Sequence, residues 1–204
     1  MIHRSNFFIV TGGPGAGKTS LIEALAMLGY PTVEEAGRRI IREQKSMGGT
    51  ATHDGDRLAY RELMFRDALD TFERMSGESG PVFFDRGLPD LIGYSHLIGA
   101  SLPDALREAV AHNRYNPLVF LAPPWRAVYG HDEERKQDFA EAVATCEAMR
   151  SAYEEAGYAL AELPLVPVEE RVRFVLERVQ AGGAAVTQSG DTPGSMPKTT
   201  DPSA

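Results

Sequence analysis

A stretch almost free of side chains, GGPGAGKTS at residues 12–20, follows the apolar run NFFIV and precedes the amphipathic segment LIEALAML. Two glycines separated by four residues and followed directly by Lys18 and Thr19 match the phosphate-binding loop pattern, whose bare backbone lets amide N–H groups wrap a polyphosphate. The order strand, glycine loop, helix is the context that this pattern requires. We therefore predict a nucleotide-binding loop between the first core strand and the first long helix.

The loop geometry also predicts how a nucleotide would be held. Backbone N–H groups of residues 13–19 and the positive end of the helix dipole would meet the phosphates. Lys18 would reach the β- and γ-phosphates, and the hydroxyl of Thr19 would bind Mg²⁺. The predicted nucleotide-binding residues of the loop are Gly12, Gly13, Gly15, Ala16, Gly17, Lys18, Thr19 and Ser20.

The apolar pattern alternates between strand and helix along the chain. Short runs rich in β-branched and aromatic residues predict strands at 6–11, 31–34, 81–85, 117–121 and 158–163. A helix after each strand favours an α/β fold with a parallel sheet covered on both faces. Two long helices are predicted to face the core, 56–76 through Leu58, Phe65, Leu69, Phe72 and Met75, and 134–156 through Phe139, Val143, Cys146, Met149 and Tyr153.

Composition limits the class of protein. The 204 residues suffice for one domain, predicted to span 1–181, and the Gly, Ser, Thr and Pro content beyond it predicts a disordered tail at 182–204. The formal net charge of −8 disfavours nucleic acid as the main partner. A single cysteine, Cys146, fits a reducing compartment, and no apolar run approaches the roughly 20 residues that cross a bilayer. We therefore expect a soluble cytoplasmic protein without a membrane partner.

Carboxylates at two strand ends are candidates for chemistry at the phosphates. Asp85 in PVFFDRG lies at the carboxyl end of its strand, the edge where ligands bind in open α/β sheets. It could orient a metal-bound water or accept a proton from an attacking hydroxyl; alternatively, it only shapes a turn. In TVEEAGR, strand alternation allows only one of Glu34 and Glu35 to face the phosphates. That carboxylate could be the general base and Arg38 could bind a substrate anion, or these residues form a solvated helix start.

Residues 120–139, FLAPPWRAVYGHDEERKQDF, predict a lid at about 124–138. Two prolines end a strand there, and a charged cluster opens a long helix. A closing lid would bring Arg126 or Arg135 onto the transferring phosphoryl group. The alternative is a charged helix start that faces solvent.

These motifs, in this order and spacing over about residues 5–180, resemble the small stand-alone AAA-type P-loop ATPase family, which is related to the ribosylnicotinamide kinase part of the bacterial NAD regulator. They are also similar to nucleoside and nucleotide kinases. The matching segments are FFIVTGGPGAGKTSLIEAL, VEEAGRRIIREQ, GPVFFDRGLPDLIGY, FLAPPW and ERKQDFAEA. The resemblance implies a P-loop kinase-like fold with a five-stranded parallel sheet ordered 2-3-1-4-5, and Mg-ATP as the donor. It also implies that residues 162–172 pack near the adenine.

The resemblance assigns expected roles to motif positions. It implies that Glu35, Arg38, Asp85, Arg86 and Arg135 are matched motif positions. Together with the loop and the lid, it predicts catalytic roles for Lys18, Asp85, Glu35 and Arg135, substrate contacts from Arg38 and Arg86, metal contacts from Thr19 and Asp85, and a cofactor contact from Arg126. The choice of base between Glu35 and Asp85 stays open.

Two functions follow from this interpretation. In the first, a kinase transfers the γ-phosphoryl group of ATP to a small hydroxyl or phosphate acceptor, which lies between residues 35–60 and the helix after Asp85, near Leu88, Tyr94 and His96. In the second, ATP orders residues 126–136 and a protein partner recognises the result. The sequence determines neither the acceptor nor the oligomeric state.

Overall fold

The sheet at the centre of the molecule is parallel and has five strands. The computed structural model describes residues 1–129 and 139–188. In spatial order the strands are β3 (Thr32–Val33), β4 (Val82–Asp85), β2 (Phe7–Gly12), β6 (Leu118–Ala122) and β7 (Ala159–Glu162). Counted along the chain within this sheet, the order is 2-3-1-4-5, as expected. What differs is an additional parallel pair, β1 (Ile2–His3) with β5 (Asn113–Arg114), which the sequence did not predict.

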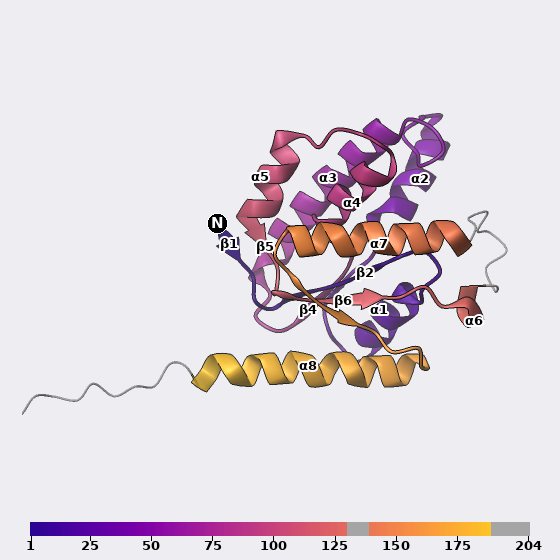
Figure 1. Cartoon of the computed structure of the whole chain (residues 1–204). Coiled ribbons are helices and arrows are strands. Elements are labelled where there is room, and N and C mark those ends of the chain that lie inside the picture. Colours follow the sequence, from indigo (N-terminus) through magenta and orange to yellow (C-terminus); the bar gives the residue numbers. More distant parts are fainter. Residues whose placement is uncertain (130–138, 189–204) are drawn as a thin grey trace, which may run out of the picture.

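Helices cover both faces of the sheet (Figure 1). On one face lie α1 (Lys18–Met27) and α8 (Val168–Gln188), which contact each other. On the other face α4 (Asp90–Leu97) packs between α3 (Arg57–Arg74) and α7 (Phe139–Glu155). The remaining helical segments are α2 (Ala36–Met47), the 3₁₀ turn η1 (Met75–Gly77), α5 (Asp104–His112) and α6 (Arg126–Tyr129).

The central strand β2 shows why the sheet needs helices on both sides. Every residue of β2 is buried, and alternate side chains enter opposite cores. Phe7 and Ile9 pack into the cluster beneath α3, α4 and α7, whereas Phe8 and Val10 pack with α1 and α8. Each large apolar side chain buried in this way contributes about 1.5–3 kcal/mol. The two-sided burial fixes the position of the loop that follows β2.

Most of the predicted core residues on the long helices are buried or partly buried, but two are not. Leu58 is 54% exposed and Val143 is 38% exposed. Leu58 lies in the first turn of α3, beyond the part that packs on the sheet. Val143 is one residue after the fully buried Ala142, so the helical rotation turns it away from the buried stripe. Residues 134–138 of the predicted helix 134–156 lie outside the described residues.

The C-terminal helix is longer than the composition suggested. Helix α8 continues to Gln188, so residues 182–188 of the predicted tail are helical. Alanines in AGGAAVTQ favour the helix, which offsets the cost of two glycines of about 1 kcal/mol each. The rest of the predicted tail, 189–204, lies outside the described residues. Among the described helices, none is long and apolar enough to cross a membrane.

Candidate active site

The glycine loop is pressed against two neighbouring elements. A Cβ atom on Gly12, whose φ is 130°, would lie 2.2 Å from the carbonyl oxygen of Ala122 at the end of β6. A Cβ atom on Gly13 would lie 2.3 Å from the carbonyl oxygen of Ala142 in α7. Both contacts are with backbone, which cannot move aside as a flexible side chain can. Only glycine fits at these positions, so the loop backbone is held in one place.

Helix α1 begins without a side-chain cap. Its N-cap is Gly17, in the left-handed conformation, and no side chain accepts a hydrogen bond from the first turn. The N–H groups of an uncapped helix start are available to an anion, and the helix dipole favours negative charge there. Thr19 and Ser20 are exposed on this turn. The predicted phosphate-binding groups therefore lie together at one helix end.

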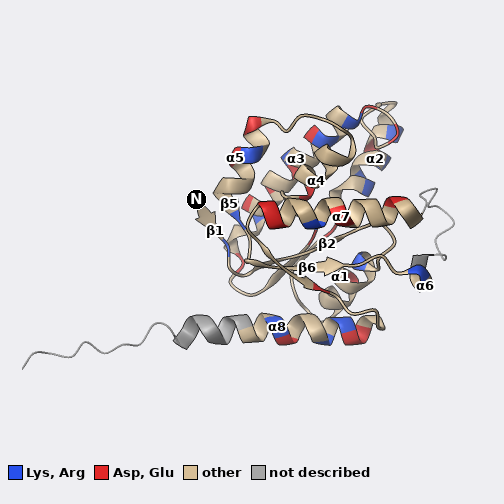
Figure 2. Ribbon diagram, in the orientation of Figure 1, with Lys and Arg blue, Asp and Glu red and all other residues tan. Residues whose placement is uncertain are grey.

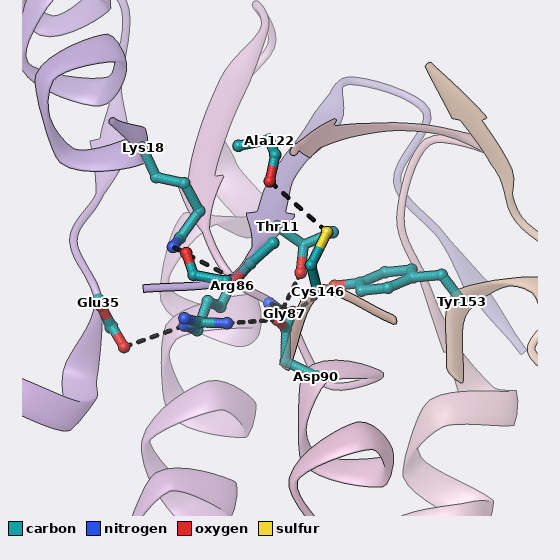
Figure 3. Close-up of polar contacts among 11 residues, drawn as sticks. Thr11, Lys18, Glu35, Arg86, Gly87, Asp90, Ala122, Cys146 and Tyr153 are labelled. Atoms are coloured by element: carbon teal, nitrogen blue, oxygen red, sulfur yellow. Dashed lines mark hydrogen bonds and ion pairs between the residues drawn. The ribbon is translucent and has the colours of Figure 1, made fainter. Parts of the chain in front are cut away.

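Lys18 folds back over the loop (Figure 3). Its side chain is buried, with the residue 5% exposed, and Nζ donates to the carbonyl oxygen of Gly13 at 2.8 Å and, more weakly, to that of Gly12 at 3.4 Å. Burial, aided by the nearby positive charge of Arg86, lowers the pKa of Lys18 to about 8. A buried ammonium group bonded only to neutral carbonyls is suited to accept an anion as partner.

Arg86 links two carboxylates beside Lys18. Its Nε donates to Glu35 Oε1 at 2.9 Å, and its Nη1 donates to Asp90 Oδ1 at 3.0 Å. Arg86 is the only non-glycine residue with a positive φ, 75°, in the described part of the chain. Burial alone would lower the pKa of Arg86, but Glu35 and Asp90 outweigh it and raise the pKa above its ordinary value. The φ strain is of the kind found at functional sites.

Glu35 is held in its ionised form. Burial favours protonation, but the charges of Arg86 and Lys18 outweigh it and lower the pKa of Glu35 to about 2. Glu34 is exposed, so one glutamate of the pair faces the loop, as strand alternation required. Glu35 is the N-cap residue of α2, which places it at the carboxyl end of β3.

Asp90 connects the loop, the arginine and α7. It is 4% exposed and accepts four hydrogen bonds, from Thr11 Oγ1 at 2.6 Å, the Gly87 N–H at 2.8 Å, Tyr153 Oη at 2.5 Å and Arg86. Burial and the Asp90 carboxylate raise the pKa of Tyr153 well above its ordinary value. Asp90 is not among the site residues predicted from the sequence. An acidic residue in an otherwise apolar, buried first turn was the available signal.

Asp85 is buried beside Lys18 and has an oxygen without a partner. The residue is 5% exposed, and its Oδ1 accepts no hydrogen bond from the described residues. Burial raises the pKa of Asp85 to about 6, while Lys18 acts in the opposite direction. A buried carboxylate oxygen that lacks a donor is costly unless a ligand or water supplies one.

A cavity of about 60 Å³ lies beside this cluster. It opens between the start of α2, helix α3 and the end of β4. Polar side chains of Glu35, Asp85 and Arg86 line one part, and apolar side chains of Met64 and Phe84 line another. The acceptor site was predicted between residues 35–60 and the helix after Asp85. The cavity agrees with this prediction only in part, because α3 residues beyond 60 form one of its walls.

Three residues expected to line the acceptor site do not line this cavity. Leu88 is fully buried in the core, and His96 is exposed. Tyr94 packs edge-on against Tyr60 with ring centroids 5.9 Å apart. Leu91, the second residue of α4, lines the cavity instead. The helix begins at Asp90, and its rotation decides which residue faces the cavity.

The basic residues predicted for the site are only partly brought together. Arg38 is exposed on α2, although its charge contributes to lowering the pKa of Glu35. Arg126 is exposed in α6, with its guanidinium 4.3 Å from the ring centroid of Phe139. Arg135 lies outside the described residues, as does the part of the predicted lid from 130 to 138. Acidic and basic residues alternate along the ribbon of several helices in Figure 2.

Arg171 supports the loop from the opposite side and was not predicted. Its Nη1 donates to the carbonyl oxygen of Ala16 at 2.7 Å and its Nε to that of Pro164 at 2.9 Å. The guanidinium lies 4.9 Å from the ring centroid of Trp125. Residues 162–172, expected near the adenine, therefore contact the phosphate loop through this arginine. An arginine that follows two glutamates on a surface-like helix gave no sequence signal of this contact.

The site offers oxygen ligands for a divalent cation. Among the described residues no group of three or more His, Cys, Asp or Glu could hold a metal ion. Mg²⁺ in nucleotide sites instead uses one or two protein oxygens together with phosphates and waters. The exposed hydroxyl-bearing turn at Thr19 and the unpartnered Oδ1 of Asp85 fit that donor set.

Comparisons with known proteins agree with this fold. A family described as an AAA domain matches residues 7–171. No curated protein matches the chain. Among solved structures, NadR protein in complex with NR is similar with a TM-score of 0.61 and 20% identity, over 95% of this chain and 54% of that chain. The chain thus spans about half of that protein.

Two kinase structures are similar over nearly their whole length. Thymidylate kinase from Candida albicans has a TM-score of 0.60 and 12% identity, over 88% of this chain and 93% of that one. A gluconokinase from Sinorhizobium meliloti 1021 has a TM-score of 0.54 and 19% identity, over 93% of this chain and 100% of that one. The fold is therefore that of P-loop kinases of nucleosides, nucleotides and sugars.

Proposed function

The chain belongs to this AAA domain family, and we propose that it is an ATP-dependent kinase that transfers the γ-phosphoryl group to a small-molecule acceptor. The observation that carries the proposal is the chain of ion pairs from Glu35 through Arg86 to Asp90, which lies beside Lys18 and borders a cavity. A phosphate loop alone supports nucleotide binding. Transfer to an acceptor also requires a group that takes the proton of the acceptor hydroxyl. A carboxylate held ionised next to a cavity can do this.

The donor binds at the loop in this proposal. The uncapped N–H groups of α1 and the loop backbone hold the phosphates, and Lys18 exchanges its bonds to the loop carbonyls for bonds to phosphate oxygens. Mg²⁺, held by Thr19 and Asp85, supplies charge neutralisation on the phosphates when it is bound. Arg126 or Arg135 would stabilise the charge that develops on the transferring group, as predicted from the sequence; Arg135 lies outside the described residues.

The acceptor hydroxyl reacts from the cavity side. Its oxygen forms a bond to the γ-phosphorus while the bond from that phosphorus to the β,γ-bridging oxygen breaks, and ADP leaves. The hydroxyl proton passes to a carboxylate, Glu35 or Asp85. Glu35 is held ionised by Arg86, whereas Asp85 has the free oxygen. Arg86 acts as the positioning residue that orients Glu35, a different role from the substrate contact that the resemblance implied.

The kinase proposal is favoured over a nucleotide-dependent switch. The segment expected to reorganise in a switch, residues 126–136, lies mostly outside the described residues and supports neither function. The cavity and its carboxylates, by contrast, are part of the described fold.

The test combines nucleotide binding with acceptor-dependent turnover. Mg-ATP should bind in titration calorimetry, and ADP should form faster in the presence of a suitable alcohol than without one. Lys18→Ala should abolish turnover. Glu35→Gln should lower kcat by about 10²–10⁴ if Glu35 is the base, whereas Glu73→Gln, an exposed matched change on α3, should leave it unchanged. ATP binding without turnover of any acceptor would refute the kinase assignment.

A further inference from the structure

The cavity beside Arg86 is lined by more carboxylates than cations. Its acidic lining residues are Glu34, Glu35, Asp67, Asp85 and Asp90. Arg86 is the one Lys or Arg among its lining residues, all of which are described. Two nitrogens of the Arg86 guanidinium are already bonded, Nε to Glu35 and Nη1 to Asp90. An anion that entered the cavity would compete with these carboxylates for the arginine.

The unpartnered oxygen in the lining requires a donor. Asp85 is almost completely buried, and its Oδ1 has no hydrogen-bond partner among the described residues. A hydroxyl or ammonium group can donate to this oxygen, whereas a phosphate or carboxylate oxygen would face it with like charge. The free polar atom therefore favours a cation, as in its proposed role at Mg²⁺, or a hydrogen-bond donor over an anion.

One cation next to the wall is already paired. Arg39 on α2 pairs with Asp67 of α3, and it also donates to Glu43 at 3.0 Å. Asp67 lines the cavity, whereas Arg39 is not among the lining residues. Arg39 therefore already has two carboxylate partners.

Most of the rest of the lining is apolar, apart from Thr71 and Tyr115, and the space is small. Val33, Met64, Ala68, Phe84 and Leu91 form the apolar part of the wall. The cavity volume is about 60 Å³. The cavity therefore receives one end of an acceptor, a hydroxyl group with the carbon atoms next to it, rather than a whole large substrate. Size alone would admit a small phosphate group, so charge decides the selection.

We propose that the acceptor is an alcohol whose reacting end carries no negative charge, either neutral or cationic, and that phosphate- and carboxylate-bearing acceptors are rejected. This inference rests on the proposed kinase function and narrows its acceptor class. Burying an anion without a cationic partner costs several kcal/mol in general, and here the available partners are carboxylates. This selection acts against anionic acceptors, because an anion in the cavity would lack a cationic partner.

The test is a set of matched acceptor pairs assayed with Mg-ATP. Ribonucleosides are compared with their 5′-monophosphates, glycerol with glycerate, and amino alcohols with the corresponding hydroxy acids. ADP formation above basal hydrolysis gives kcat/KM, and phosphorus NMR identifies the product. We expect turnover only among neutral and cationic alcohols. An anionic compound that is turned over as well as its uncharged partner would overturn the acceptor class while leaving the kinase function intact.

Charge variants test the cause of the selection. Asp67→Asn removes one lining carboxylate and releases Arg39, so the kcat/KM ratio of anionic to neutral acceptors should rise about tenfold. Glu34→Gln changes an exposed rim residue and should move the ratio in the same direction without a risk to folding. Asp70→Asn, the matched control, alters an exposed carboxylate on the same helix that pairs with Arg74 outside the cavity. Its ratio should not change.

The possible failures are distinguishable. If neither Asp67→Asn nor Glu34→Gln changes the ratio, the carboxylates do not select the acceptor and the inference is refuted. If ATP binds but no compound of any charge is phosphorylated, the kinase function fails and the acceptor class with it. If ATP itself does not bind, the donor site has been misassigned.

Discussion

Replacing Asp90 with asparagine should destabilise the protein and loosen Arg86 at the same time. In the native structure Oδ1 accepts from Thr11 and Arg86, and Oδ2 accepts from the Gly87 N–H and from Tyr153. Asparagine retains one acceptor oxygen and replaces the other with an NH₂ group. With its oxygen toward Arg86, the amide donates toward Gly87, whose N–H is also a donor.

The magnitude follows from these contacts. The Tyr153 hydroxyl can turn and accept from the new amide, so this bond is kept in reversed form. The Gly87 N–H becomes a buried donor without an acceptor, which costs about 1–3 kcal/mol. The Arg86 bond changes from an ionic to a neutral acceptor and loses about half of its 1.5–3 kcal/mol. Because Asp90 is only 4% exposed, solvent does not compensate, and we expect a total loss of about 3 kcal/mol.

Urea denaturation followed by circular dichroism measures this loss. Against a typical total stability of about 5–15 kcal/mol, the Asp90→Asn protein should still fold. Tyr153→Phe, which removes one hydrogen bond to the same carboxylate, should lose about 1–2 kcal/mol. Asp70→Asn, an exposed carboxylate in a surface ion pair with Arg74, should lose less than about 1 kcal/mol.

Two results would refute this reasoning. A loss below about 1 kcal/mol in Asp90→Asn would mean that the carboxylate does not hold the cluster together. A loss in Asp90→Asn no larger than that in Tyr153→Phe would mean that the bonds from Gly87 and Arg86 contribute less than expected. In turnover assays, Asp90→Asn should lower kcat and leave the affinity for ATP nearly unchanged, because Arg86 orients the acceptor side of the site.

Three further predictions concern the loop and its neighbours. ATP affinity should fall as the pH rises through about 8, because burial lowers the pKa of Lys18 to about 8 and the neutral amine loses its attraction for phosphate; in titration calorimetry, Lys18→Ala should show no such dependence. Asp85→Asn should lower turnover at least about a hundredfold while ATP still binds, and a rate within threefold of the unmodified protein would exclude Asp85 from the chemistry. Gly13→Ala should abolish ATP binding and lower stability by about 1–3 kcal/mol, since its Cβ would lie 2.3 Å from the Ala142 carbonyl oxygen. Gly80→Ala, with no atom within 4 Å of the added Cβ, should behave as unmodified in thermal melts.

Features that depend on neighbouring residues in the chain were predictable. The period of the apolar pattern located the five core strands, each within about two residues of its observed bounds, and the glycine spacing located the start of α1. These predictions succeed because side-chain periodicity and backbone freedom are local properties. The pair of β1 and β5 was missed because two-residue strands are too short to show a period.

The catalytic candidates Lys18, Asp85 and Glu35 could be named from the sequence, because strand ends and a loop motif place them at one edge of the sheet. The contacts between distant segments that build the site could not be predicted. Arg86 bonds to Glu35, which lies 51 residues earlier, and Arg171 bonds to Ala16 across 155 residues. Nothing in either local segment indicates the partner.

The sequence by itself determined that a phosphate loop follows a buried strand in an α/β fold. Only the tertiary structure decided that Asp90 ties Thr11, Arg86 and Tyr153 together, that Asp85 keeps an oxygen without a donor, and that Asp67, which lines the cavity, pairs with Arg39. The physical reason is that burial sets the energy of a charge. Whether a carboxylate is solvated, paired or left free depends on which distant segments pack around it, and this packing exists only in the folded chain.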